Sequence, residues 1–239
     1  MKNMKVNCFI QARMGSNRLP GKVMKIIRGK PVIEHIILAL KKSNLIDSIV
    51  VLTSDRETDE VLVNFLKKNN YLYFRGNEND VLQRYVEAGK KFSCYLVVRI
   101  TADCPLTDPQ IVDKVIQHAL LSGADYTSNV LERTFPDGHD VEVIKYSVLE
   151  NINEESVDKL EHEHITLHIL KNKSKFKVKN VCAPINKHHS EWRICLDTEK
   201  DLSLIRKIYD SFPESHIISY DDIIHLFEKY PQLPKINKC

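Results

Sequence analysis

Several familiar signatures are missing from this 239-residue sequence, and each absence narrows what the protein can be. No apolar stretch is long enough to span a bilayer, and the apolar run in the N-terminal MKNMKVNCFIQAR is too short for a signal peptide. None of the six cysteines form a C-x-x-C pair, and Cys8, Cys94 and Cys195 lie in or beside apolar runs. This indicates reduced core thiols in a reducing compartment. We therefore expect a cytoplasmic protein with no membrane partner.

Four ligand-binding signatures are also absent. No Lys/Arg block with interleaved aromatic residues is present, so we expect no nucleic-acid partner, and the net charge of +3 fits a small anionic ligand. Neither the Walker spacing nor the dinucleotide G-x-G-x-x-G fingerprint occurs. His164 and His168 stand four residues apart, but Ile165 follows His164, so the glutamate of H-E-x-x-H is missing and catalytic zinc is disfavoured.

What is present is a regular alternation of apolar runs and helical periods. The length suits one large α/β domain, and a hydrophobic fraction of 43% is enough for a sizeable core. In the first half, helices are predicted to begin near residues 31, 57, 80 and 108, where Asp80 and Asp108-Pro109 are capping signals. They alternate with predicted strands at 6–10, 48–53, 72–74, 95–100 and 126–128.

The second half is less regular. Strands are predicted at 140–144, 176–181 and 193–196, and helices at 147–153, 156–171, 199–209 and 221–229. The tail at 231–239 carries two prolines and little periodicity, so we expect it to be frayed. We treat residues 1–239 as one domain, in which the segment around 135–190 could be an insertion that serves an acceptor or a dimer partner.

This order of elements predicts a mostly parallel, twisted sheet with helices on both faces, that is, an α/β, Rossmann-like fold. Ligands of such sheets bind outside the carboxyl ends of the strands. The loop after the first strand and the segment 101–103 both leave strands at that edge, so they should converge on one crevice.

The loop after the first strand, QARMGSNRLPGK at 11–22, is the densest motif of the chain. Its small residues allow sharp turns that point backbone N–H groups at one spot, and Arg13, Arg18 and Lys22 surround that spot with positive charge. Such a loop suits a polyphosphate. The alternative is a basic surface loop with no ligand.

Two aspartates, Asp103 and Asp197, directly follow predicted strands. Carboxylates in that position can hold Mg²⁺, which prefers hard oxygen ligands and commonly assists transfer to an α-phosphate. Either aspartate could instead cap a helix, and Asp197 in particular could cap the helix that follows it. The residues alone leave both readings open.

Six segments in register then resemble one family over almost the whole chain. QARMGSNRLPGK, FRGNENDVLQRY, RITADCPLTDP, TFPDGHDVEV, EHEHIT and RICLDTEKD are similar to motifs of the cytidylyltransferases that activate acid sugars as CMP-sugars. The resemblance is closest to the SpsF branch, also described as acylneuraminate-cytidylyltransferase-like. It implies a nucleotide-diphospho-sugar transferase (GT-A-like) fold.

The resemblance also implies CTP and Mg²⁺ as donor and cofactor, a small sugar acceptor whose hydroxyl attacks the α-phosphate, and pyrophosphate as leaving group. A homodimer is compatible with it. By motif position Arg13 and Lys22 grip the phosphates and Asp103 and Asp197 hold the metal, so the expected catalytic residues are Arg13, Lys22 and Asp103. The expected nucleotide-binding residues are Gln11, Ala12, Arg13, Gly15, Ser16, Arg18, Lys22, Arg75 and Thr101.

Other charged residues are assigned by the same reasoning. Arg75 is expected near the nucleotide, whereas Arg84 is read as an ordinary surface partner on the helix capped by Asp80. Arg99, inside a buried strand, must meet either a carboxylate or a ligand. Candidate acceptor-binding residues are Asp140, Glu142, Glu163 and His164, although Asp140 and Glu142 could equally form a solvated strand face or hold a second Mg²⁺.

The sequence departs from better-known members at Gln11, where they usually carry proline, and in FRGNENDVLQRY, which leaves acceptor and base identity open. A glycosyltransferase that uses a finished sugar nucleotide is one alternative, but it would usually show D-x-D where this chain has TADCP. A nucleotide-binding relative without turnover is another. Release of pyrophosphate separates the leading hypothesis from both.

Overall fold

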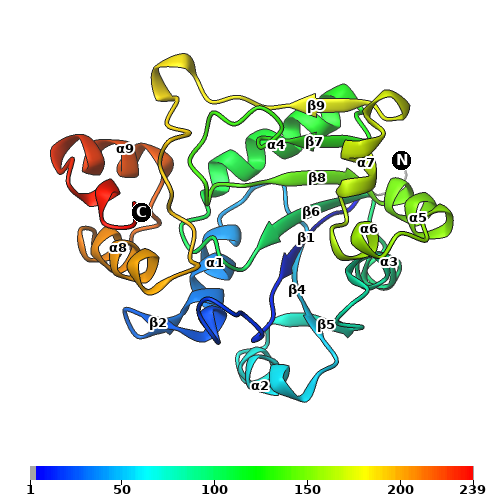
Figure 1. Cartoon of the computed structure of the whole chain (residues 1–239), viewed down its shortest axis with the longest axis horizontal. Helices are drawn as coiled ribbons and strands as arrows, with labels where there is room; N and C mark the ends of the chain where they lie inside the picture. The colour runs from blue at the N-terminus through cyan, green and yellow to red at the C-terminus, as the bar shows by residue number, and fades with distance from the viewer. Residues whose placement is uncertain (1–3, 239) are drawn as a thin grey trace.

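The computed structural model of this chain describes residues 4–238, which leaves residues 1–3 of the N-terminal segment and Cys239 outside the description. Its centre is a seven-stranded sheet in the order β5-β4-β1-β6-β8-β7-β9 (Figure 1). Only β8 runs antiparallel to its neighbours, β6 and β7, which confirms the predicted mostly parallel sheet. The strands are β1 (Val6–Gln11), β4 (Ser48–Ser54), β5 (Leu72–Gly76), β6 (Leu96–Thr101), β7 (Tyr126–Ser128), β8 (Glu142–Lys145) and β9 (Val178–Asn180).

Helices cover both faces of this sheet because its central strands are apolar on both sides. In β1, Cys8 and Ile10 pack into one hydrophobic cluster and Phe9 into the other. The first cluster is covered by α1 (Val32–Leu40), α2 (Glu60–Lys68), α4 (Pro109–Ser122), α8 (Glu199–Asp210) and α9 (Tyr220–Lys229). The second is covered by α3 (Val81–Lys91), α5 (Tyr146–Glu155) and α7 (Leu167–Lys171). The short helix α6 (Lys159–Glu163) packs beside α3.

The remaining elements are short. A two-stranded sheet is formed by β2 (Ile26–Ile27) and β3 (Lys30–Pro31). The 3₁₀ helices are η1 (Lys22–Met24), η2 (Glu57–Asp59), η3 (Lys173–Lys175), η4 (Ile185–Lys187) and η5 (Leu233–Lys235). Asp80 and Asp108 cap α3 and α4 as predicted, by accepting hydrogen bonds from the backbone N–H of Gln83 and Gln110. Within residues 4–238, no helix has the length and apolar character required to cross a bilayer.

The prediction of one continuous helix over 156–171 was wrong. The chain forms α6 and α7 instead, and His164 leaves the helical conformation between them with φ −113° and ψ 84°. Because the chain turns at this point, Ile165 and Ile169 both reach the core, while His164 faces a cavity described below. Tertiary burial therefore overrides a helical period that is continuous in the sequence.

The predictions for 193–196 and for the tail were also wrong. Residues 193–196 form no strand, and only Arg193 pairs, through one isolated bridge to Asp137. The tail at 231–238 is ordered: Asn237 is 9% exposed, and its side-chain amide donates hydrogen bonds to the Arg193 carbonyl at 3.0 Å and to Asp201 Oδ1 at 2.7 Å. A buried amide with two partners holds the end of the tail in place.

Candidate active site

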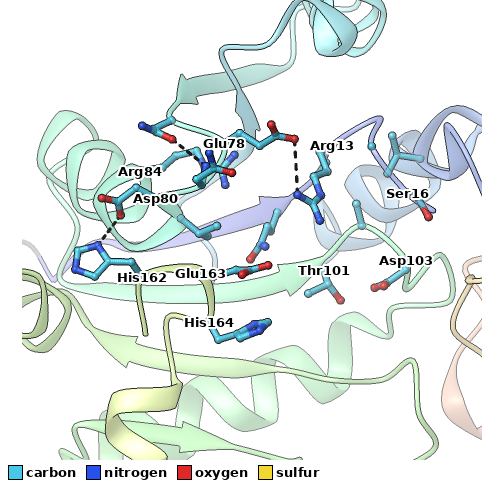
Figure 2. Close-up of a pocket in the computed structure, with 18 of the residues that line it drawn as sticks. Arg13, Ser16, Glu78, Asp80, Arg84, Thr101, Asp103, His162, Glu163 and His164 are labelled. Carbon is cyan, nitrogen blue, oxygen red and sulfur yellow. Dashed lines mark hydrogen bonds and ion pairs between the residues drawn. The ribbon is translucent and has the colours of Figure 1, made fainter. Parts of the chain in front are cut away.

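A cavity of about 1160 Å³ opens at the carboxyl ends of the parallel strands (Figure 2). Its walls come from the loops after β1, β5 and β6, from the segment around α6 and from Asp197. The predicted convergence of the basic loop with segment 101–103 is therefore observed. Of the predicted site residues, the cavity is lined by Gln11, Ala12, Arg13, Gly15, Ser16, Arg18, Lys22, Thr101, Asp103, Glu163, His164 and Asp197, and not by Arg75, Asp140 or Glu142.

Three backbone amides of the basic loop donate hydrogen bonds that fix its path, one to the sheet, one to the side chain of Asp59 and one within the loop. The amide of Ala12 donates to the Leu52 carbonyl at 2.9 Å, that of Met14 to Asp59 Oδ1 at 2.7 Å, and that of Gly21 to the Met14 carbonyl at 3.1 Å. Gly21 has φ 66°, a left-handed conformation that glycine adopts without strain, and this turn delivers Lys22 to the cavity. The loop thus has a defined path despite its polar composition.

Asp59 is the residue that anchors this loop, and sequence reasoning missed it. It is 1% exposed and also accepts hydrogen bonds from Thr53 Oγ1 at 2.9 Å and Ser54 Oγ at 2.6 Å. Burial alone raises the pKa of Asp59, but these donors outweigh it and hold the pKa below its usual value. The carboxylate stays charged and acts as a fixed acceptor for the loop.

Between these anchors, part of the loop backbone is free. No residue within 4–238 accepts a hydrogen bond from the amides of Gly15, Ser16 or Asn17, and all three residues line the cavity. The Ser16 hydroxyl accepts from the Leu19 amide at 3.4 Å, which closes a local turn. Unpaired amides in a turn between cations are a common feature of anion sites, and anion binding by this loop stays a prediction.

Lys22 brings the two predicted acidic residues together. Its ammonium Nζ donates to Asp103 Oδ2 at 2.9 Å and to Asp197 Oδ1 at 2.9 Å. Burial alone lowers the pKa of Lys22, but the two carboxylates outweigh it and raise the pKa. Burial likewise raises the pKa of Asp103, yet Lys22 holds it below the usual value. All three groups are therefore charged at neutral pH.

Asp197 also meets two arginines. Arg18 Nη2 lies 2.9 Å from Asp197 Oδ2, and Arg193 Nη2 donates to the same oxygen. Burial raises the pKa of Asp197, and the hydrogen bond from Lys22 is the largest of the effects that reverse this and lower it. Asp197 is not the cap of α8, because Thr198 occupies the N-cap in a capping box with Asp201. The helix-cap alternative for Asp197 is thereby excluded.

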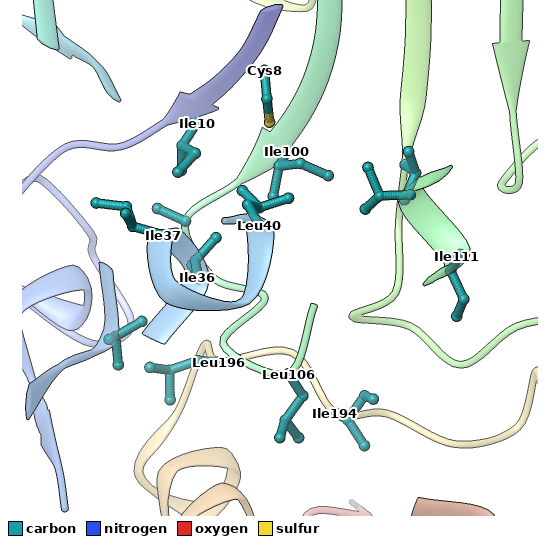
Figure 3. Close-up of a cluster of buried hydrophobic side chains, with 14 of the residues drawn as sticks. Cys8, Ile10, Ile36, Ile37, Leu40, Ile100, Leu106, Ile111, Ile194 and Leu196 are labelled. Atoms are coloured by element: carbon teal, nitrogen blue, oxygen red, sulfur yellow. The ribbon is translucent and has the colours of Figure 1, made fainter. Parts of the chain in front are cut away.

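The core positions both aspartates from beneath. Leu196, immediately before Asp197, is fully buried, and Figure 3 shows it in the same cluster as Ile10 and Ile100. The Leu196 amide donates to the Asp103 carbonyl at 2.7 Å, which joins the two acidic segments directly. Both aspartates lie outside regular elements, and this hydrogen bond and the buried Leu196 side chain hold their segments in place.

The predicted positions of Arg75 and Arg84 were both wrong, because Arg84 lines the cavity and Arg75 does not. Arg75 lies outside the cavity, where it pairs with Glu60 and donates Nε to the Ser54 carbonyl at 3.1 Å and Nη2 to the Arg56 carbonyl at 3.1 Å. Arg84, read as a surface residue, is 3% exposed and lines the cavity. Side chains alternate between the faces of a strand, and Arg75 of β5 pairs with Glu60 at the start of α2.

Asp140 and Glu142 also lie outside the cavity, which corrects their placement in an acceptor site. Glu142 is 6% exposed, forms an ion pair with Arg99 and accepts from the Tyr126 hydroxyl at 2.6 Å. Asp140 accepts from both terminal nitrogens of Arg133, at 2.7 and 2.8 Å. Glu142 therefore lies on an internal face of β8, whereas Asp140, which precedes the strand, keeps a side chain that is 31% exposed. Of the two partners expected for Arg99, the structure shows the carboxylate, that of Glu142.

The remaining wall comes from the segment around α6. His162 is held by Asp80 Oδ1 at 2.8 Å through Nδ1 and by the Ser156 carbonyl at 2.9 Å through Nε2, and these partners raise its pKa. Both ring nitrogens face oxygen acceptors, which the imidazolium form satisfies. Glu163 and His164 follow and line the cavity next to this anchor (Figure 2). Sequence reasoning found the last two residues and missed His162.

Known proteins are similar to this chain in both fold and sequence. A family model described as cytidylyltransferase matches residues 7–228. A solved cytidylyltransferase from Leptospira borgpetersenii serovar Hardjo-bovis superposes with a TM-score of 0.93 at 33% identity and covers 99% of each chain. The spore coat polysaccharide biosynthesis protein SpsF of Bacillus subtilis is 31% identical over 228 residues, or 93% of this chain and 94% of its own.

A more distant structure extends the likeness of fold. A CMP:2-keto-3-deoxy-manno-octonic acid synthetase complexed with CTP has a TM-score of 0.64 at 18% identity, covers 87% of this chain and 99% of its own, and shows the fold alone. The family model, in contrast, spans the basic loop, Asp103 and Asp197. From the cationic loop facing two carboxylates and from this match, the chain belongs to the cytidylyltransferase family and is a nucleotidyltransferase.

Proposed function

We propose that this protein transfers CMP from CTP to a hydroxyl group of a sugar or sugar acid. The hydroxyl oxygen forms a bond to the α-phosphorus, and the bond from that phosphorus to the bridging oxygen breaks. Pyrophosphate takes the electron pair, and the hydroxyl proton passes to solvent. Catalysis then depends on positioning and on neutralising charge at the phosphates.

The observation that carries the proposal is the contact of Lys22 with both Asp103 and Asp197 beside the loop 11–18. The free amides of Gly15 and Ser16 offer donors for phosphate oxygens, and Arg13 and Arg18 supply positive charge to the β- and γ-phosphates. Arg13 is only weakly held, with Nη1 3.8 Å from Glu78 Oε1, so it can turn toward a ligand.

The carboxylates fit a magnesium ion. Lys22 keeps Asp103 and Asp197 charged, and Mg²⁺ commonly takes one or two carboxylates together with substrate oxygens. Within residues 4–238 no group of three or more His, Cys, Asp or Glu side chains could hold a metal, so other ligands must come from the nucleotide and water. An ion bound there would polarise the α-phosphate and lower the pKa of the attacking hydroxyl.

We infer that the acceptor contacts the part of the cavity wall formed by Glu163 and His164. This part of the wall is distinct from the phosphate loop. Carboxylate and imidazole groups suit the hydroxyls of a sugar. Two relatives support a sugar acceptor: SpsF is named for spore coat polysaccharide biosynthesis, and the more distant synthetase for a CMP-activated keto-sugar acid. We therefore propose a role in surface polysaccharide or glycan biosynthesis. A cytoplasmic location and a homodimer stay predictions.

The proposal is tested by pyrophosphate release from CTP, with Mg²⁺, across a panel of keto-sugar acids and other sugars. We expect one acceptor class to support turnover in the wild type and none in Asp103→Asn or Asp197→Asn, both with normal melting temperatures. Asp210→Asn is the matched control, because Asp210 forms an exposed ion pair with Arg28 outside the cavity. Full activity of Asp103→Asn would remove that carboxylate from the mechanism.

A further inference from the structure

The carboxylate of Glu78 lies beside the part of the basic loop whose amides have no acceptor within residues 4–238. Glu78 follows β5 and lines the cavity, and its side chain is 25% exposed, so it has room to move. A Cβ atom on Gly15 would lie 3.9 Å from Glu78 Oε1, and Arg13 Nη1 lies 3.8 Å from the same oxygen. One oxygen of this carboxylate therefore stands between a cation of the loop and the backbone of the loop (Figure 2).

A second arginine holds the carboxylate from another side. Arg56 Nε lies 2.7 Å from Glu78 Oε2, which is a shorter contact than that of Arg13. Arg56 belongs to the turn between β4 and η2 and lies outside the cavity lining. The two oxygens of Glu78 thus face two arginines, one loosely paired at the cavity and one closely paired outside it. A ligand that takes Arg13 would leave Glu78 with Arg56 as its partner.

The position of Glu78 conflicts with a phosphate at the same place. Two anions a few ångströms apart repel each other, and the repulsion is stronger beside a protein than in open water because the effective dielectric constant is lower. A phosphate oxygen bound between Arg13 and the Gly15 backbone would meet Glu78 Oε1 at such a distance. The carboxylate must therefore move away before a phosphate can bind there.

We propose that Glu78 is a positioning residue that occupies the place of the phosphates between reactions, keeps Arg13 at the loop, and competes with nucleotide and pyrophosphate for that arginine. This inference rests on the proposed function, in which the basic loop binds the triphosphate. When the triphosphate enters, Arg13 passes from Glu78 to a phosphate, and Glu78 stays on Arg56. After the transfer the carboxylate competes for Arg13 again, which favours the release of pyrophosphate.

The test is calorimetric titration of the full chain with pyrophosphate in the absence of Mg²⁺, so that no metal ion bridges the two anions. We expect Glu78→Gln, which keeps the shape of the side chain and removes its charge, to bind pyrophosphate about tenfold more tightly than the wild type. A purely structural role of Glu78 would weaken binding instead. Glu60→Gln is the matched control: Glu60 also pairs with an arginine, Arg75, but lies outside the cavity lining, so the affinity should change by less than about twofold.

A second variant, Arg56→Gln, should have the opposite effect. The carboxylate then loses its closer partner and pairs more firmly with Arg13, so pyrophosphate binding should weaken about threefold. When Arg56→Gln is added to Glu78→Gln, it should change the affinity by less than about twofold, because Arg56 acts through Glu78. Thermal melts of all four variants show that each is folded.

Unchanged or weaker pyrophosphate binding by folded Glu78→Gln overturns the inference. An effect of Arg56→Gln that is equal with and without Glu78 overturns it as well. Titration of the wild type with CTP and Mg²⁺ tests the proposed function separately. No binding of CTP overturns the proposed function, whereas CTP binding together with an unchanged pyrophosphate affinity in Glu78→Gln overturns only the inference.

Discussion

Lys22→Met is the most informative single change, because Lys22 touches both acidic residues of the site. Its ammonium makes two contacts of 2.9 Å to charged oxygens, and its side chain is 15% exposed. A hydrogen bond to a charged group contributes roughly 1.5–3 kcal/mol. Arg18 and Arg193 remain on Asp197 in the variant, so the loss falls mainly on Asp103. We expect the free energy of unfolding to drop by about 2 kcal/mol, the contribution of one such contact, because Asp197 keeps its two arginines and the cavity is open to solvent.

Two further effects should accompany this loss. With the ammonium removed, both carboxylates are open to a cation, so added Mg²⁺ should raise the melting temperature of Lys22→Met more than that of the wild type. Turnover should fall at least about a hundredfold, because a charge that stabilises the transferring phosphoryl group is gone.

The assays are urea unfolding, thermal melts with and without Mg²⁺, and pyrophosphate release. Lys25→Met is the matched control: Lys25 follows the same 3₁₀ helix but forms an exposed ion pair with Glu199, so its loss should change stability by less than about 0.5 kcal/mol. Equal stability and an equal response to Mg²⁺ in Lys22→Met and wild type would refute the reasoning.

Three other predictions follow from single contacts. Arg13→Ala should lower kcat/KM about a hundredfold with the melting temperature unchanged, since Arg13 is exposed and weakly paired; wild-type kinetics would contradict this. The raised pKa of His162 means that its contribution to stability is complete below its ordinary pKa of 6.5 and is lost as pH rises through the raised value. Urea unfolding should therefore show a larger deficit for His162→Gln at pH 6 than at pH 9, and a constant deficit would contradict it. Gly138→Ala should cost about 3 kcal/mol in the same assay, because φ is 118° and a Cβ would lie 2.8 Å from backbone atoms of Ile194 and Cys195; unchanged stability would disprove this constraint.

The elements that the sequence predicts well are those whose signal is local. The run 6–10 became β1, and the Asp108-Pro109 signal became the start of α4, because strand burial and capping act over a few residues. The break at His164 has no comparable local signal. It depends on Ile165 entering the core and on His162 meeting Asp80 across 82 positions of the chain.

The same distinction applies to the site. The basic loop and the two aspartates were predictable because strand ends in a parallel sheet meet at one edge, and Asp103 and Asp197 do meet at Lys22. The predicted positions of Arg75 and Glu142 were wrong because the surroundings of a strand's side chains depend on which strands and helices lie next to it. Glu142 turns inward toward Arg99 since β8 pairs with β6, and no local pattern encodes that pairing.

The buried amide of Asn237 has a practical consequence for handling this protein. It donates hydrogen bonds to the Arg193 carbonyl and to the carboxylate of Asp201 in α8. The same Asp201 carboxylate accepts a hydrogen bond from the Asp197 amide. Cutting the chain before that residue, or forcing a bulky fusion against it, would remove these hydrogen bonds and loosen the segment that carries Asp197, a proposed metal ligand. Purification tags are therefore better placed at the N-terminus. Low turnover of a C-terminally tagged protein would reflect the loss of the Asn237 hydrogen bonds and not a defect in the chemistry.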